Sequence, residues 1–114
     1  MTVKEAIERS GAQLSSGGGE ALRYVCWLRE LEARLNAEIY GIDRAPVLTE
    51  NSILSAPEAY ADIYPLYLMM KRELLTGDAA RYGLYRTELE NAVGRYLNFI
   101  TRRMPVTSVY IKTL

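Results

Sequence analysis

The chain has 114 residues, of which 49% are hydrophobic and 25% are charged. These proportions are typical of one globular domain and exclude a chain that is disordered throughout. Fourteen basic and fourteen acidic residues give a net charge of zero, which argues against a protein whose whole surface binds nucleic acid.

Residue types that carry chemistry are scarce. The chain has no histidine, the side chain used most often for acid–base catalysis near neutral pH and for metal binding. Cys26 is the only cysteine, so an intrachain disulfide is excluded, which fits a reducing compartment. The sequence has no phosphate-binding GxxxxGK[ST] loop. We therefore expect no enzyme activity, no catalytic residues, no metal and no cofactor.

The first residues predict a short helix and no export signal. Thr2-Val3-Lys4-Glu5 matches a capping box, so we expect a helix from there to about Ala12. This segment lacks the apolar core of a signal peptide. The longest apolar run, residues 63–70, contains Pro65 and is too short to span a membrane. We expect an intracellular protein without a membrane partner.

Residues 20–40 have the clearest helical pattern. A connector containing Gly17-Gly18-Gly19 precedes them, and Gly41 is placed to end the helix. Apolar residues at helical spacing form one stripe, which consists of Tyr24, Leu28, Leu31, Leu35 and Ile39. Cys26 lies off this stripe, and we expect it to have no role.

Residues 42–56 are irregular. Pro46 and Pro57 punctuate the region, and its apolar pairs, Val47-Leu48 and Ile53-Leu54, are short. Either two short paired strands or a loop packed down by these pairs fits the pattern.

A helix should follow from Ser55 or Ala56 to Thr76, and Gly77 should end it. Pro65 lacks the N–H that would bond to the carbonyl of Ala61, which predicts a kink or break near Tyr64.

Three tyrosines recur within this segment at helical spacing, at positions 60, 64 and 67. Such a stripe fits a platform for stacked bases or a packed helix face whose hydroxyls reach the rim. We favour the packed face.

The last helix is predicted from Ala79 to about Arg103, with Asp78 as N-cap and Pro105 as the stop. Its expected buried stripe consists of Tyr82, Tyr85 or Arg86, Leu89, Val93, Tyr96 and Ile100. Gly83 and Gly94 cost about 1 kcal/mol each relative to alanine, and close approach of another helix is one way to compensate for that cost. The most central positions of the two long stripes, which should be buried, are Leu28, Leu35, Leu89, Val93 and Tyr96.

The predicted fold is therefore all-α. It is a small bundle of three to four helices with an irregular loop at residues 42–56. The helical domain covers residues 1–105, and residues 106–114 form a β-branched, extended C-terminal tail.

Charge is distributed unevenly along the chain. Residues 42–78 carry three basic and six acidic side chains, a sum of −3, whereas residues 79–114 carry six and two, a sum of +4. Copies of the chain with such surfaces can meet head to tail, with unlike charges facing each other. The alternative is two solvated faces that merely balance. The candidate assembly interface consists of Arg95, Arg102, Arg103, Val106, Val109 and Ile111.

Five short stretches carry a family resemblance. They are Thr2-Val3-Lys4-Glu5-Ala6-Ile7-Glu8, Trp27-Leu28-x-Glu30-Leu31-Glu32, Pro57-x-x-Tyr60-x-x-Ile63-Tyr64-Pro65-Leu66-Tyr67-Leu68, Gly77-Asp78-x-Ala80-Arg81-Tyr82 and Arg103-Met104-Pro105. Over about residues 1–105 the chain resembles small proteins encoded in the structural gene clusters of tailed phages and prophages of Gram-positive bacteria. These proteins are grouped as head–tail connector, or adaptor, proteins. The tail after Pro105 lies outside the pattern.

The resemblance implies an all-α, non-enzymatic virion subunit. It would assemble head to tail into a ring between the portal and the tail, and the genome would pass through the channel without sequence recognition. Its partners would be further copies of itself and portal or tail-completion proteins. It would be found in the virion, or in the host cytoplasm before assembly. No catalytic or ligand residues carry over, because the shared positions are packing positions.

The alternative is a small DNA-binding regulatory protein that uses the basic last helix. Its support is five arginines, at positions 81, 86, 95, 102 and 103. At 100° per residue, however, Arg86 and Arg95 lie 180° apart, so the arginines form no single row facing a groove of DNA.

Overall fold

The computed structural model describes residues 1–12 and 19–103. Its α-helices are α1 (Val3–Arg9), α2 (Gly19–Leu35), α3 (Ile63–Thr76) and α4 (Ala79–Arg103). A π-helical turn, η1 (Asn36–Tyr40), continues α2, and a 3-10 turn, η2 (Glu58–Tyr60), precedes α3. The predicted all-α architecture is confirmed. None of the described helices is long and apolar enough to cross a membrane.

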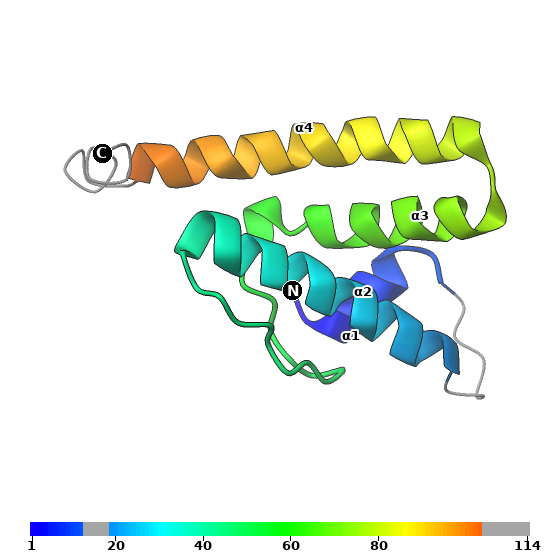
Figure 1. The fold of residues 1–114 in the computed structure, drawn as a ribbon, viewed down its shortest axis with the longest axis horizontal. Helices are drawn as coiled ribbons and strands as arrows, with labels where there is room; N and C mark the ends of the chain where they lie inside the picture. The colour runs from blue at the N-terminus through cyan, green and yellow to red at the C-terminus, as the bar shows by residue number, and fades with distance from the viewer. Residues whose placement is uncertain (13–18, 104–114) are drawn as a thin grey trace.

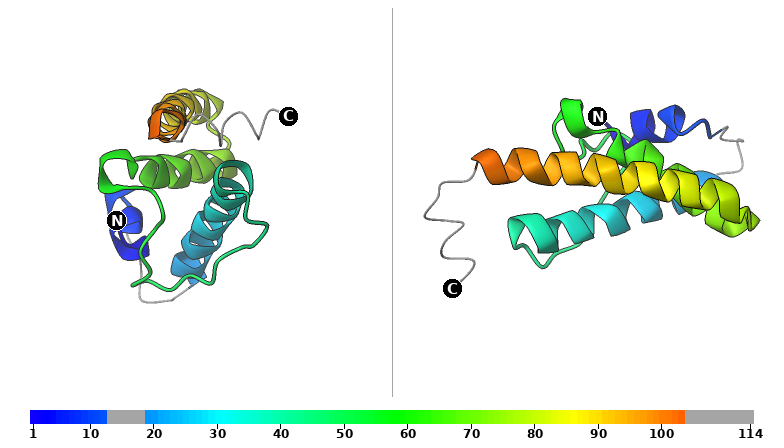
Figure 2. Two further views of the ribbon diagram at one scale, coloured as in Figure 1. Left: turned by 90° about the vertical axis from the view of Figure 1, so that its left-hand side faces the viewer. Right: turned by 90° about the horizontal axis from the view of Figure 1, so that it is seen from above.

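Helix α3 is the central element. Helix α4 lies antiparallel along one side of it, while α1 and α2 pack on the other side (Figures 1 and 2). The sharp reversal between α3 and α4 occurs at Gly77, whose φ of 79° favours glycine. The Asp78 carboxylate accepts a hydrogen bond from the Arg81 N–H at 3.0 Å, which confirms Asp78 as the N-cap of α4.

The capping box of α1 forms as predicted. The Thr2 hydroxyl accepts from the Glu5 N–H, and the Glu5 carboxylate accepts from the Thr2 N–H, both at 3.2 Å. The helix ends at Arg9, before the predicted Ala12, because Gly11 takes a φ of 78° that leaves the helical region.

Residues 42–57 form a loop, so of the two alternatives that the sequence left open the packed loop is the one observed, and the paired strands do not form. The backbone makes one isolated bridge there, between Thr2 and Ile53. The N–H groups of Val3 and Lys4, which lack partners inside α1, bond to loop carbonyls at 3.0 Å. The start of α1 thus holds the loop in place. Leu54 is buried, whereas Val47 and Ile53 are exposed. At most one residue of each apolar pair, Val47-Leu48 and Ile53-Leu54, therefore packs against the core.

The break at Pro65 is confirmed. The chain forms η2, turns, and starts α3 at Ile63. Pro65 therefore falls in the first turn of α3, where a missing N–H costs no helical hydrogen bond.

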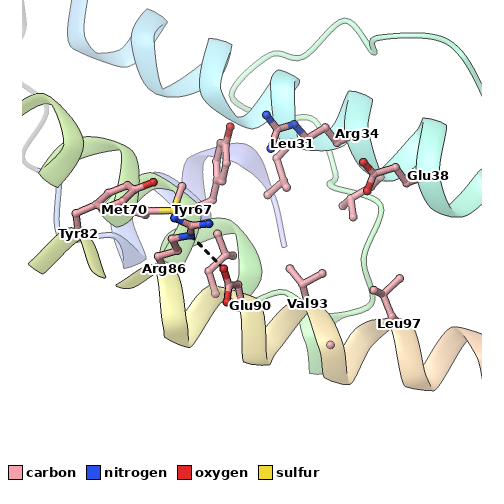
Figure 3. Close-up of a pocket in the computed structure, with 13 residues that line it drawn as sticks. Leu31, Arg34, Glu38, Tyr67, Met70, Tyr82, Arg86, Glu90, Val93 and Leu97 are labelled. Carbon is pink, nitrogen blue, oxygen red and sulfur yellow. Dashed lines mark hydrogen bonds and ion pairs between the residues drawn. The ribbon is translucent and has the colours of Figure 1, made fainter. Parts of the chain in front are cut away.

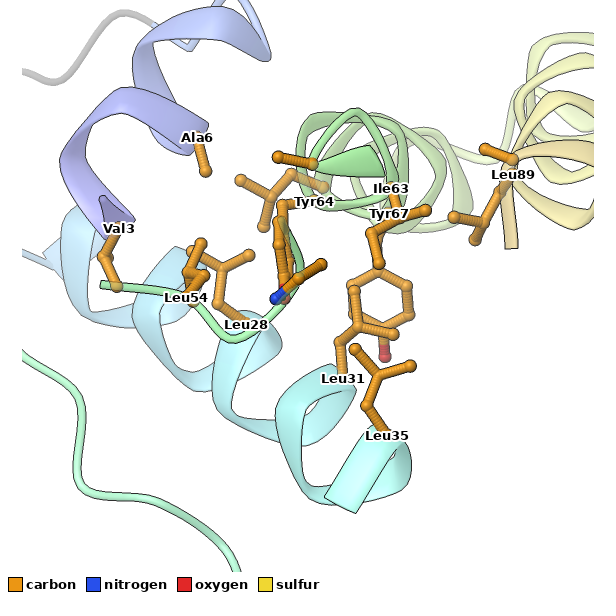
Figure 4. Packing of buried hydrophobic residues seen from close by; sticks show 14 of the residues in the cluster. Val3, Ala6, Leu28, Leu31, Leu35, Leu54, Ile63, Tyr64, Tyr67 and Leu89 are labelled. Carbon is orange, nitrogen blue, oxygen red and sulfur yellow. The ribbon is translucent and has the colours of Figure 1, made fainter. Parts of the chain in front are cut away.

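The core lies where α1, α2 and α3 meet, and α4 closes one side of it (Figure 4). Four of the five predicted core positions, Leu28, Leu35, Leu89 and Tyr96, are buried. Val93 is only partly buried and packs at the edge of the cluster. Its neighbour Ala92 is buried instead, because the face of α4 that packs on α3 includes Ala92 and leaves Val93 at its edge.

Close approach of another helix of the described chain does not compensate for the two helix glycines. A Cβ atom added at Gly83 or at Gly94 would meet no heavy atom within 4 Å. Neither glycine therefore marks a close approach between helices of the described chain.

Candidate functional site

Only part of the acidic segment lies on the opposite side of the molecule from the basic last helix. Helix α4 forms one outer layer, and the loop of residues 42–57 lies on the far side of α3 (Figures 1 and 2). The rest of the acidic segment, residues 42–78, contacts the basic segment, residues 79–114, within the same chain. Helix α3 belongs to the acidic segment and packs directly on α4.

Arg95 takes part in that internal contact. Its guanidinium lies 3.4 Å from the Asp62 carboxylate, and both side chains are more than half exposed. An exposed pair of this kind contributes little to stability. It does reduce the charge that Arg95 can offer to another molecule.

Arg102 and Arg103 stand at the C-terminal end of α4, where they complement the helix dipole. The Arg102 side chain donates to the Asn98 carbonyl at 3.3 Å, and the Arg103 guanidinium lies 5.3 Å from the centre of the Phe99 ring. Neither arginine is within 4 Å of a carboxylate among the described residues. They therefore leave α4 with a basic end. Val106, Val109 and Ile111 lie outside the described residues.

An open groove of about 530 Å³ lies between α2 and α4. Tyr67 and Met70 of α3 form its floor (Figure 3). Its apolar wall residues are Leu31 and Leu35 on α2 and Leu89, Val93 and Leu97 on α4. Leu97 is 42% exposed, so the groove presents apolar surface to solvent.

Charged side chains border this groove on both sides. Arg34 extends from α2 and Glu38 from η1, and Arg86 and Glu90 extend from α4, where they pair at 3.1 Å (Figure 3). The rim therefore carries two positive and two negative groups. A balanced rim around an apolar floor suits a polypeptide segment of low charge better than a strongly charged ligand.

Tyr67 connects the floor of the groove to α2. Its hydroxyl donates to the Glu30 carboxylate at 3.2 Å, and Lys71 lies 3.4 Å from the same carboxylate. Burial, and next the negative charge of Glu30, raise the pKa of Tyr67 to about 12.

A buried polar cluster lies beside the groove, inside the core. The Glu32 side chain is 4% exposed. Its carboxylate accepts from the Tyr64 hydroxyl at 2.6 Å and from the N–H and hydroxyl of Ser55 at 3.0 Å each. The Tyr64 hydroxyl accepts from the Ala56 N–H at 2.9 Å. Burial, and then the nearby Glu32 charge, raise the pKa of Tyr64 well above its ordinary range.

This cluster satisfies its members completely. Among the described residues no buried side-chain nitrogen or oxygen lacks a hydrogen-bond partner. Its role is therefore to fasten the end of the 42–57 loop to α2 and α3. A second hydrogen bond joins the hydroxyl of Tyr40, which is partly exposed, to that of buried Tyr96, and burial raises the pKa of Tyr96.

Two features of this region escaped sequence analysis, namely the groove and the role of Glu32. A signal for Glu32 was present, since it lies four residues after Leu28 and so falls on the apolar stripe of α2. The groove left no such signal, because it depends on the angle between two helices.

Within residues 1–12 and 19–103, no group of three or more His, Cys, Asp or Glu side chains is placed to hold a metal ion. Cys26 is exposed on α2. Comparison with protein-family models, with curated proteins and with solved structures gave no match to this chain.

Proposed function

We propose that this protein is a non-enzymatic virion structural subunit, a head–tail connector or adaptor that assembles as a ring between portal and tail. The observation that carries the proposal is the placement of two unlike surfaces on opposite sides of α3. One is the basic C-terminal end of α4, and the other is the loop of residues 42–57 (Figure 1). The resemblance over residues 1–105 supports the same function.

The geometry suits a repeated head-to-tail contact. A contact between two different patches of the same chain leaves each patch free on the outermost copies, so it repeats and closes into a ring when the rotation allows. Arg102 and Arg103 supply positive charge on one side. Asp43 and Glu50 are exposed in the loop together with Arg44, so the other side carries a net charge of −1. A net charge of zero leaves little repulsion between copies.

The test is charge reversal with a compensating change. In the double variant Arg102→Glu/Arg103→Glu, we expect assembly with the portal, or self-assembly at high concentration, to weaken at least tenfold at low salt. The loss should diminish at high salt, where surface charges are screened. Adding Asp43→Arg and Glu50→Arg should restore part of the assembly.

A matched control reverses two arginines outside both surfaces. Arg23→Glu/Arg29→Glu makes the same change in charge on exposed positions of α2, and it should leave assembly within twofold of the unchanged protein. Equal losses in both double variants would refute the proposed contact, because net charge alone would then explain them.

DNA binding through α4 is the second candidate, and the ion pairs weigh against it. Arg81 pairs with Asp78, Arg86 with Glu90 and Arg95 with Asp62. Three of the five arginines of α4 therefore already have acidic neighbours. A duplex affinity that falls steeply with salt would favour this candidate over the connector.

A further inference from the structure

Helix α4 has a face that the rest of the described chain leaves largely uncovered. Its buried residues, Leu89, Ala92 and Tyr96, pack toward α3. At 100° per residue, a set of positions beside this packed face falls within a sector of about 120° on the groove side of the helix. We call this set the α4 strip, and it consists of Ala79, Tyr82, Gly83, Arg86, Glu90, Val93, Gly94 and Leu97. Most of the strip lines the groove (Figure 3).

The two glycines of the α4 strip have no explanation within the fold. Glycine in a helix interior lowers stability relative to alanine, yet a Cβ atom added at Gly83 or Gly94 would meet no heavy atom within 4 Å. Leu97, on the same side of α4, is 42% exposed. The strip therefore combines room for the close approach of another helix with apolar surface that the described chain leaves in water.

From the groove, the charges at its rim and the order of large and small residues along α4, we infer that the α4 strip pairs with the same strip of a second copy in an antiparallel, two-fold dimer. In such a dimer each residue faces the one that lies equally far on the other side of the axis. An axis beside position 88 pairs position 79 with 97, 82 with 94, 83 with 93 and 86 with 90. Every position of the strip then faces another position of the strip.

These pairings are complementary in size. Each large apolar side chain faces a small residue of the partner: Tyr82 meets Gly94, Val93 meets Gly83 and Leu97 meets Ala79. Facing positions that combine one large and one small residue allow two helices to interdigitate. The two glycines thus provide the space that the large side chains of the other copy need.

The pairings are also complementary in charge. Arg86 faces the partner's Glu90, and because the two-fold axis repeats every contact, Glu90 faces the partner's Arg86. Within one chain these two exposed side chains already pair at 3.1 Å. The dimer therefore joins two ion pairs into a network of four alternating charges.

Charge excludes the neighbouring arrangements. Sliding one helix along the other by one turn brings Glu90 against the partner's Glu90 in one direction and Arg86 against the partner's Arg86 in the other. A parallel two-fold pair would place every residue beside its own copy, again with like charges together. Like charges across an interface oppose binding. Of these arrangements, only the antiparallel pair with its axis beside position 88 joins unlike charges.

The contact is small. From Ala79 to Leu97 the strip is about 27 Å long, and one helix face of that length buries less than the about 800 Å² per partner of a standard interface. We therefore expect a dissociation constant of about 1–100 μM. The inference does not rest on the proposed function, because Arg102 and Arg103 lie outside the sector of the strip. A contact between identical patches also stops at two copies, whereas a head-to-tail contact repeats.

Charge exchange between two copies tests the pairing in the full chain. Analytical ultracentrifugation of the protein alone measures its monomer–dimer equilibrium. Arg86→Glu and Glu90→Arg should each weaken the dimer at least tenfold, because each substitution places like charges opposite each other twice. An equimolar mixture of the two variants should form a heterodimer about as tight as the original dimer. Repair within one chain cannot explain that recovery, because each chain in the mixture keeps its own substitution.

A matched control makes the same changes of charge outside the strip. Arg29→Glu on α2 and Glu88→Arg on α4 alter exposed side chains, and Glu88 lies on the opposite side of α4 from the strip. Each of these variants should dimerise within twofold of the unchanged protein. If either weakens the dimer as much as the strip variants do, net charge explains the effect and the pairing is refuted.

A second variant tests the size complementarity without a change in charge. Gly94→Leu fills the place of the partner's Tyr82 and should weaken the dimer at least tenfold, whereas Asn91→Leu, at an exposed position outside the strip, should not. At concentrations where the chain is monomeric, Gly94→Leu should unfold at the same or a higher urea concentration than the unchanged protein, because the position is open. Loss of the dimer is then not a consequence of unfolding.

Three results would overturn the inference. The first is an unchanged chain that stays monomeric up to about 1 mM. The second is a Gly94→Leu or Arg86→Glu variant that dimerises as tightly as the unchanged chain. The third is a loss of the dimer in Arg102→Glu/Arg103→Glu, which would assign self-association to the basic end of α4 and not to the strip.

Discussion

Replacing Tyr64 by phenylalanine removes one hydroxyl from the centre of the core and leaves the ring in place. That hydroxyl donates to Glu32 at 2.6 Å and accepts from the Ala56 N–H at 2.9 Å. A hydrogen bond to a charged group contributes about 1.5–3 kcal/mol, and a buried donor left without a partner costs about 1–3 kcal/mol. Because Glu32 keeps both bonds from Ser55, we expect a total loss of about 2–4 kcal/mol.

The matched control is Tyr67→Phe, which makes the same chemical change one turn later on α3. The Tyr67 hydroxyl bonds to Glu30 at 3.2 Å, and the Glu30 side chain is 54% exposed, so water replaces the lost hydroxyl. We expect this variant to lose no more than about 1 kcal/mol. Urea denaturation followed by circular dichroism measures both losses, provided that the slope of unfolding free energy against urea is unchanged. Equal losses would refute the conclusion that the Glu32 cluster fastens the loop to the core.

Three further outcomes are expected. Leu28→Ala should cost about 2–5 kcal/mol in a thermal or urea melt because Leu28 is fully buried, whereas Leu22→Ala, at an exposed position of the same helix, should cost less than about 0.5 kcal/mol. Gly83→Ala should stabilise the protein by about 0.5–1 kcal/mol, since the added Cβ meets no atom within 4 Å; a loss would show that another group approaches α4 there. Stability should fall as pH rises from 10 to about 12, because folded Tyr67, with its pKa raised to about 12, holds a proton that the unfolded chain releases near pH 10. Tyr64 and Tyr96 act in the same direction, and tyrosinate absorbance near 295 nm should therefore rise late and together with unfolding.

Local rules explain why much of the fold was predictable. The capping box at Thr2, the break at Pro65 and the end of α3 at Gly77 each depend on a few neighbouring residues. Such signals remain valid whatever the rest of the chain does, because they concern hydrogen bonds and φ angles within one turn.

The features that sequence analysis missed depend on the packing of distant segments. Glu32 and Tyr64 are 32 positions apart and meet only because α2 crosses α3. The same holds for the ion pair of Arg95 with Asp62. It joins the basic and acidic segments within one chain, whereas the charge pattern had suggested a contact between two copies. The sequence could not show whether another helix of the chain approaches Gly83 and Gly94, because a glycine in a helix signals close packing only when another helix lies beside it.

The proposed connector function is tested most directly by native mass spectrometry of this protein mixed with a portal protein encoded next to its own gene, if its gene neighbourhood contains one. We predict a complex in which many copies of the chain join one portal ring, with fewer copies bound by the Arg102→Glu/Arg103→Glu variant. A chain that stays monomeric in that mixture at every concentration, or a gene cluster without a portal gene, would contradict the account.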